Sequence, residues 1–72
     1  MERTRLKQYR VGKKMTQAEF AKTLGYSRGQ YARIENGEQD VTINFLQALE
    51  QAFGIGIIKA KELTKRDNER KE

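Results

Sequence analysis

The sequence predicts a compact all-α domain of four or five helices, with two short helices at its centre. Two helix-start signals lie eleven residues apart, because Thr16 is followed three residues later by Glu19 and Ser27 by Gln30. In such a capping box, each of the two side chains accepts a hydrogen bond from the backbone NH of the other residue. Proline, which interrupts helices, is absent from the chain. Two helix starts so close together indicate a pair of helices joined by a tight turn.

The helix pair extends over residues 17–37, and glycines and apolar spacing set its bounds. Gly25 can adopt the left-handed conformation that ends the first helix, and Gly37 can end the second in the same way. The inward positions recur at spacings of three and four residues and are Phe20, Ala21 and Leu24 in the first helix and Tyr31 and Ile34 in the second. The small side chain of Ala21 allows two helices to cross closely at a steep angle.

Composition limits the class of protein. A chain of 72 residues makes one small domain, of a size at which dimerisation helps a single core. Its 15 basic and 10 acidic residues leave a net charge of +5, which favours a polyanionic partner without choosing between nucleic acid and an acidic protein. Because cysteine and histidine are absent, we expect no disulfide, metal or cofactor. No apolar run approaches the roughly 18 residues that span a bilayer, and no signal-peptide core is present, so we expect a soluble, cytoplasmic protein.

Residues 1–14 carry six basic residues and one acidic residue. Their net charge of +5 equals that of the whole chain. If residues 3–11 form a helix that Gly12 ends, Leu6, Tyr9 and Val11 can face inward. The cations left on the solvated side are then Arg3, Arg5, Lys7 and Lys13. Two interpretations stay open for this charge: a solvated helix face, or contacts with a phosphate backbone through Lys13 and Lys14.

A set of residues in and after the helix pair has a distinctive spacing: Gln17, Ala21, Gly25, Tyr31 and Ile34, followed by Glu35, Asn36 and Gly37. This spacing resembles that of the Cro/repressor-type (XRE) helix-turn-helix family, and the likeness runs over residues 6–55. The resemblance implies a phage-repressor-like fold with a central helix-turn-helix that binds double-stranded DNA. The chain departs from the family pattern at Tyr31, where a branched aliphatic residue is usual.

The resemblance also implies a structural salt bridge between Arg10, late in the first helix, and Glu35, late in the third. A guanidinium can hold a carboxylate through two parallel hydrogen bonds, so this pair would fix the recognition helix against the first helix. The resemblance further implies that the amide of Gln17 meets a DNA phosphate. Gln17 lies in the first turn of its helix, where the backbone NH groups and the helix dipole favour an anion.

The recognition helix, expected over residues 28–35, has an outward face without acidic residues. The base-contact candidates on this face are Arg28, Gly29, Ala32 and Arg33. An arginine can donate two hydrogen bonds to guanine O6 and N7, so guanine-containing half-sites are favoured. The alternative is that one of the two arginines contacts only the DNA backbone. Gln30 is expected to divide between the capping box and the phosphates.

The loop of residues 36–41 is where the resembling family commonly adds phosphate contacts. The candidates here are Asn36, Gln39 and the backbone NH of Gly37. The carboxylates of Glu38 and Asp40 oppose a close approach of phosphates to the middle of this loop.

Thr42 is expected to cap a fourth helix over residues 43–53. Its apolar stripe, expected in the core, comprises Ile43, Leu46, Leu49 and Phe53. No cation occurs between residues 38 and 53, so this part of the domain is expected to face away from the nucleic acid.

Ile55, Ile57 and Ile58 form an apolar cluster whose surface a domain of this size cannot easily bury in full. We predict that this cluster forms a dimer interface. Composition favours a fifth helix from Ile57, but an exposed strand that pairs with a second copy stays open. The helix-turn-helix domain is assigned to residues 1–63. Residues 64–72 form a charged tail that is expected to be disordered.

Taken together, these features predict a sequence-specific DNA-binding transcriptional regulator that represses as a homodimer on a palindromic operator. An alternative is an antitoxin, in which residues 55–72 bind a toxin and the helix-turn-helix regulates its own gene. An enzyme is not expected, because histidine and cysteine are absent and no carboxylate pair or glycine-rich loop forms a recognisable catalytic set.

Overall fold

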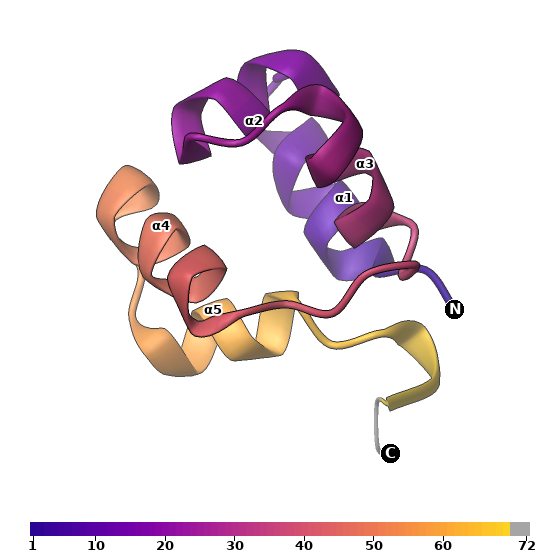
Figure 1. Cartoon of the computed structure of the whole chain (residues 1–72). Coiled ribbons are helices and arrows are strands. Elements are labelled where there is room, and N and C mark those ends of the chain that lie inside the picture. The colour runs from indigo at the N-terminus through magenta and orange to yellow at the C-terminus, as the bar shows by residue number, and fades with distance from the viewer. Residues whose placement is uncertain (70–72) are drawn as a thin grey trace.

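The computed structural model describes residues 1–69, and this part of the chain is helical with no strand (Figure 1). The helices are α1 (Thr4–Gly12), α2 (Gln17–Leu24), α3 (Arg28–Glu35), α4 (Ile43–Phe53) and α5 (Ile57–Leu63), followed by a 3-10 turn, η1 (Asp67–Glu69). The predicted all-α class is therefore confirmed. The segment after Gly54 continues as a helix, so the alternative of an exposed strand is wrong.

Both predicted capping boxes form and start α2 and α3. The hydroxyl of Thr16 accepts a hydrogen bond from the backbone NH of Glu19 at 3.1 Å, and the Glu19 carboxylate accepts one from the Thr16 NH at 2.9 Å. Ser27 and Gln30 make the same two bonds, both at 3.1 Å. Gly25, between the helices, has a φ of 82° in the left-handed region. The turn between α2 and α3 therefore follows from local signals.

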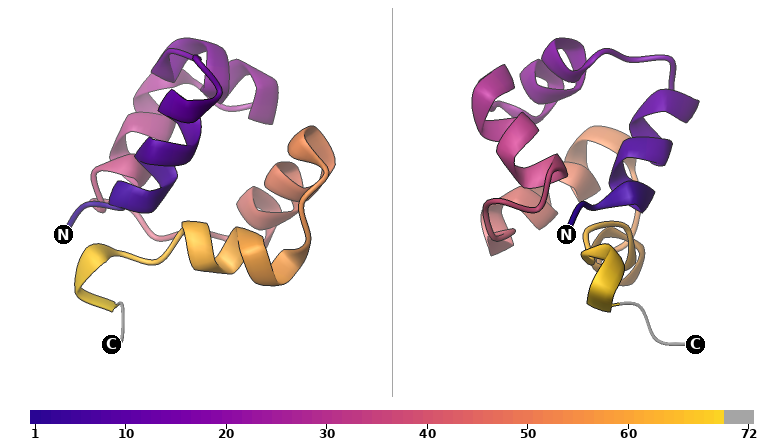
Figure 2. Two further views of the ribbon diagram at one scale, coloured as in Figure 1. Left: turned by 180° about the vertical axis from the view of Figure 1, so that it is seen from behind. Right: turned by 90° about the vertical axis from the view of Figure 1, so that its right-hand side faces the viewer.

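The other three helices form the support for this pair. Helix α1 packs against α3 and α5, and α2 packs against α3 and α4 (Figure 2). The largest fully buried side chains come from four helices and are Leu6, Phe20, Tyr31, Ile34, Phe45 and Leu49. The Phe20 ring stacks on Phe53 with centroids 4.9 Å apart, and Tyr9 meets the edge of Phe53 at 5.7 Å. These aromatic contacts join α1, α2 and α4 in one core.

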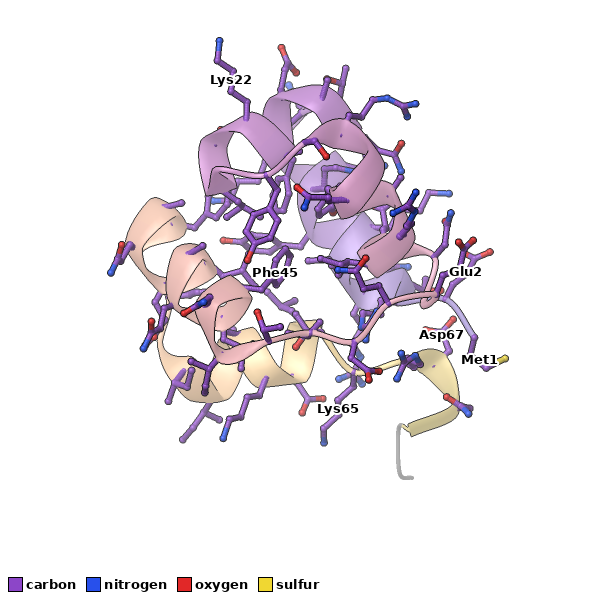
Figure 3. The ribbon with its side chains drawn as sticks, viewed as in Figure 1. Met1, Glu2, Lys22, Phe45, Lys65 and Asp67 are labelled. Carbon is purple, nitrogen blue, oxygen red and sulfur yellow. The ribbon has the colours of Figure 1, made fainter. Side chains whose placement is uncertain are left out.

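The apolar stripe of α4 differs from the prediction at one position. Ile43 is 60% exposed, and Phe45 is fully buried in its place, beside the predicted Leu46 and Leu49. Phe45 lies at the centre of the domain, 5.3 Å from the ring of Tyr26 and 6.4 Å from that of Tyr31 (Figure 3). The space between these two rings accepts the phenyl group, so α4 is rotated to bury Phe45 and its first residue projects into solvent.

The end of α1 differs from the prediction at Val11, which does not face inward but is 54% exposed. The helix ends at Gly12, as predicted. After it, the backbone NH groups of Lys13 and Lys14 donate to carbonyls of α1, and Lys14 has a positive φ of 60°.

Arg3 was expected to be solvated, and that prediction is wrong. Its side chain is buried, with 2% of the residue exposed. The guanidinium donates to the carbonyls of Thr64 at 2.6 Å and Gln39 at 2.9 Å, and also to the carbonyl of Ile34. Since these carbonyls lie in two parts of the chain that are remote from Arg3 in sequence, residues 34–39 and Thr64, local pattern could not reveal that Arg3 is internal.

The expected disordered tail also differs from the structure over residues 64–67. Thr64 is buried, and the Asp67 carboxylate accepts hydrogen bonds from the backbone NH of Thr4 at 3.0 Å and from its hydroxyl. The Asp67 NH donates to the carbonyl of Glu2 at 2.8 Å, so the two ends of the described chain lie side by side (Figures 2 and 3). Residues 68 and 69 lie in η1, and the last part of that expectation, for residues 70–72, lies outside the described residues.

Candidate nucleic-acid interface

Helix α3 has a cationic outward face and a buried inward face. The exposed or partly exposed positions are Arg28, Gly29, Ala32 and Arg33. The buried positions are Tyr31, Ile34 and Glu35. Two exposed guanidinium groups on one helix face can attract phosphates and can also donate to base edges.

The structure brings Arg10 and Glu35 together in a buried salt bridge between α1 and α3. Arg10 Nε lies 2.9 Å from Glu35 Oε2, and Arg10 Nη2 lies 3.3 Å from Oε1. A third donor of the guanidinium, Nη1, reaches the carbonyl of Met15 at 2.8 Å. The two parallel bonds fix the last turn of α3 against the last turn of α1.

Two further side chains donate to the same carboxylate. The Tyr31 hydroxyl lies 2.6 Å from Glu35 Oε2, and Gln17 Nε2 lies 3.0 Å from Oε1. Sequence reasoning treated Tyr31 only as a larger apolar ring and missed its hydroxyl. The four-residue spacing between Tyr31 and Glu35 was the available signal, because it places the two side chains on neighbouring turns of one helix.

These contacts determine which groups of the site carry charge. Burial alone would raise the pKa of the Glu35 carboxyl, but the hydrogen bonds from Arg10, Tyr31 and Gln17 outweigh it and hold that pKa below its usual range. Burial, followed by the hydrogen bond to Glu35, raises the pKa of the Tyr31 phenol. The hydrogen bond to Glu35 raises the pKa of Arg10. The buried cluster is therefore an ion pair with a neutral phenol beside it.

Gln17 connects this buried cluster to the exposed face of α3. Its amide nitrogen donates to Glu35, and its amide oxygen accepts a bond from Arg28 Nη1 at 3.3 Å. The long second bond orients the Arg28 guanidinium near the start of α2. Both ends of the Gln17 amide are therefore engaged within the protein. Its phosphate contact stays a prediction.

The lysines after α1 take different positions. Lys13 Nζ lies 5.1 Å from the centroid of the Tyr9 ring and 5.5 Å from that of Phe53, in cation–π geometry. Lys13 is exposed as a residue, and its phosphate contact stays a prediction. Lys14 is exposed at its left-handed position.

The loop after α3 provides fewer backbone donors than expected. The Gly37 NH donates to the carbonyl of Ile34 at 3.1 Å, which closes the last turn of α3, so the expectation that it serves a phosphate is wrong. A Cβ at Gly37, whose φ is 81°, would overlap the carbonyl of Met1. The side chains of Asn36 and Gln39 are exposed, and their phosphate contacts stay predictions.

The predicted dimer cluster divides in the structure. Ile55 and Ile57 are half-buried and pack against the core, whereas Ile58 on α5 is 82% exposed. Only Ile58 therefore lies fully outside the core, because the turn at Gly54 directs the other two side chains back onto the domain.

Within residues 1–69, no helix has the length and apolar character that crossing a membrane requires. The same residues contain no cluster of acidic side chains that could hold a metal ion.

Comparison with known proteins identifies the family. Residues 6–59 match a family model described as helix-turn-helix, and this match spans α1 to α4 and the start of α5. No curated protein and no solved structure matches the chain. Because the match covers most of the chain, including the capped α2–α3 pair and the helices that support it, the protein belongs to the Cro/repressor-type (XRE) helix-turn-helix family of DNA-binding transcriptional regulators.

Proposed function

We propose that the protein is a repressor that binds a palindromic operator as a homodimer, with the outward face of α3 in the major groove. The observation that carries this proposal is the face itself. Arg28 and Arg33 are exposed on a helix that Glu35 anchors to α1, and neither forms an ion pair within residues 1–69. A dimer bound over a promoter would exclude the polymerase, so repression would be steric.

Affinity and selectivity would come from different residues in this scheme. Phosphate contacts supply most of the affinity, and contacts with base edges supply selectivity. The proposed phosphate contacts are Gln17, Gln30, Asn36, Gln39, Lys13 and Lys14. The proposed base contacts are Arg28 and Arg33, with Gly29 and Ala32 allowing a close approach and Ala32 able to touch a thymine methyl group.

The most direct experiment is selection of bound duplexes from a random DNA pool. The proposal requires an enriched sequence with two-fold symmetry and guanine in each half-site, since arginine donates in pairs to guanine O6 and N7. Enrichment of a site without symmetry would contradict the palindromic operator. Absence of any enriched sequence would contradict specific binding.

Replacing Arg28 or Arg33 with alanine is expected to weaken binding to the selected operator by about 1 to 3 kcal/mol, with a smaller loss on unrelated DNA. The loss arises because the bidentate contact with guanine disappears while the phosphate contacts remain. Titrations of operator and scrambled duplexes at one salt concentration measure the loss of affinity on each. Lys22→Ala, which removes one exposed charge from α2, is the matched control. Equal losses on both duplexes would assign the arginine to the DNA backbone.

The proposed dimer follows from the small size of the recognition helix. Eight residues in α3 cover only a few base pairs, too few to find one site among the competing sequences of a genome. Two copies related by a two-fold axis would place their recognition helices about 34 Å apart, one turn of DNA. The proposed interface is the cluster Ile55, Ile57 and Ile58, with Ile58 at its centre because it is the most exposed of the three.

Replacing Ile58 with lysine is expected to abolish dimerisation while the helical content is retained. The reason is that Ile58 contributes little to the monomer core but would carry a charge into the interface. Sedimentation measures the oligomeric state, and DNA titration should change from cooperative operator binding to weak half-site binding. Val11→Lys introduces the same charge at an exposed apolar residue on α1 and should leave the dimer intact. A dimer as stable as that of the parent would place the interface elsewhere.

The antitoxin alternative would require residues 55–72 to be available to a toxin. Over residues 64–67 this segment is instead hydrogen-bonded to the N-terminus, through Asp67 to Glu2 and Thr4. That contact favours the repressor over the antitoxin. Co-purification of a second protein that binds this segment would reverse the preference.

A further inference from the structure

The loop between α3 and α4 carries negative charge next to the proposed DNA face. Glu38 and Asp40 are both exposed in this loop, which begins directly after the recognition helix. Charges interact over about 8 Å at physiological ionic strength. Uncompensated carboxylates here would therefore repel the phosphates of a duplex that lies along α3.

A cation from the other end of the chain meets this loop. Arg66 Nη2 lies 2.7 Å from Asp40 Oδ1, and Arg66 Nε donates to the carbonyl of Gly37 at 3.0 Å. The Arg66 side chain is 23% exposed, whereas that of Asp40 is 88% exposed, so the guanidinium lies beneath the carboxylate and against the loop backbone. The Arg66 guanidinium holds the pKa of the Asp40 carboxyl below its usual range.

Arg66 is held in place by contacts on both sides of it. Before it, the Thr64 carbonyl accepts a hydrogen bond from Arg3, whose guanidinium also donates to Gln39 in the loop. After it, the Asp67 carboxylate accepts from Thr4 (Figure 3). An exposed ion pair usually contributes little, because ordering two long side chains costs entropy. Here residues 64–67 are already ordered, so that cost is reduced.

We infer that Arg66 is a positioning residue for DNA binding, which offsets the charge of Asp40 and fixes the loop beside the recognition helix. This inference rests on the proposed contact of α3 with duplex DNA. It assigns to residues 64–67 a role in affinity for DNA, in addition to their contacts with the N-terminus.

A double-mutant cycle on the full chain tests the inference, with Arg66→Gln, Asp40→Asn and the double variant. Affinities for the operator selected by the parent protein are measured at several salt concentrations, at a temperature where circular dichroism shows every variant folded. Arg66→Gln is expected to lower the affinity about threefold to tenfold at low salt, because Asp40 is then unpaired. In the Asp40→Asn background the same substitution should have little effect, because the carboxylate that pairs with Arg66 is already absent.

A purely structural role would not give this rescue. If Arg66→Gln lowered the melting temperature but left the affinity of the folded protein unchanged, the inference would be wrong. An equal loss of affinity in both backgrounds would also overturn it, since Arg66 would then act independently of Asp40.

Two control variants separate this test from the test of the proposed function. Lys65→Gln removes the neighbouring cation, which projects away from the loop and lies 3.7 Å from Glu62 (Figure 3), and it should change the affinity less than Arg66→Gln. Arg28→Ala on the same operator tests the α3 contact itself. If Arg28→Ala weakens binding and Arg66→Gln does not, the inference alone fails. If neither substitution weakens binding, the proposed α3 contact fails as well.

Discussion

Replacing Glu35 with alanine is expected to destabilise the domain by about 3 to 5 kcal/mol, because it leaves the buried Arg10 guanidinium without its carboxylate. The same substitution removes the acceptor of the Tyr31 hydroxyl and the Gln17 amide. Arg10→Ala should have a comparable effect, since Glu35 would then be a buried anion with only neutral donors. Chemical denaturation followed by circular dichroism measures the free energy of unfolding. The free energy of unfolding of a small domain is only about 5 to 15 kcal/mol in total, so a loss of this size is readily observed.

The double variant distinguishes a pair from two independent residues. When both charges are removed, no uncompensated charge stays buried, so the double variant should be less destabilised than the sum of the single variants. The control is the pair Arg5 and Glu62, which joins α1 to α5 with side chains that are 34% and 50% exposed. Removing either of those partners should change stability by about 1 kcal/mol or less. Strict additivity for Arg10 and Glu35 would contradict the pairing.

Acid titration provides an independent measurement on the same site. The pKa of Glu35 is lowered in the folded protein, so its contribution to stability is fully present above the pKa of the unfolded chain, about 4.3. That contribution is lost as the pH falls through the lower, folded pKa. Glu35→Gln should lack this part of the acid sensitivity. The Asp40 carboxyl also has a lowered pKa, but it is present in both proteins, so the difference between them reports Glu35.

Replacing Arg3 with methionine is expected to destabilise the domain by about 3 kcal/mol, because three backbone carbonyls lose the guanidinium that donates to them. Two of these carbonyls, those of Ile34 and Gln39, lie at the end of the recognition helix and in the loop that follows. The third belongs to Thr64, after α5. Thermal and chemical denaturation measure the loss. The last turn of α3 should also lose protection from hydrogen exchange, since Arg3 joins it to the N-terminus.

A matched control for this prediction lies two residues away. Arg5→Met removes a partly exposed guanidinium from the same end of α1 and should have a much smaller effect on stability. The stability of Arg3→Lys should lie between those of the parent and Arg3→Met, because an ammonium can donate in three directions but lacks the planar fork of a guanidinium. If Arg3→Met were as stable as the parent, the buried contacts of Arg3 would contribute nothing to the fold.

Several parts of the fold and the site depend on residues close in sequence, and these were predictable. The two capping boxes use side chains and NH groups three residues apart, so the starts of α2 and α3 can be located before any tertiary contact is known. The outward face of α3 follows from helix geometry once its start is set. The Arg10–Glu35 pair came from the family resemblance and not from the residues alone.

Periodicity alone did not determine which face of α4 is buried, and side-chain packing did. In α4, a stripe that includes Ile43 and one that includes Phe45 both fit a helical period and share Leu46 and Leu49. Phe45 is the buried one because the rings of Tyr26 and Tyr31 line the space that it fills. Likewise, the apolar character of Ile55 and Ile57 could not tell a core flank from an interface, since both environments exclude water.

By itself, the sequence determined the all-α class, the helix-turn-helix and the cationic face of α3, because each depends on hydrogen bonds or spacing within one or two turns of helix. Only the tertiary structure decided that Arg3 is buried, that the Tyr31 hydroxyl completes the shell of Glu35, and that Arg66 meets Asp40. The identity of a charged or polar residue does not indicate which distant residue it will pair with. Arg3 and Thr64 are 61 residues apart, and the burial of such a group is settled only when the folded chain brings its acceptors to it.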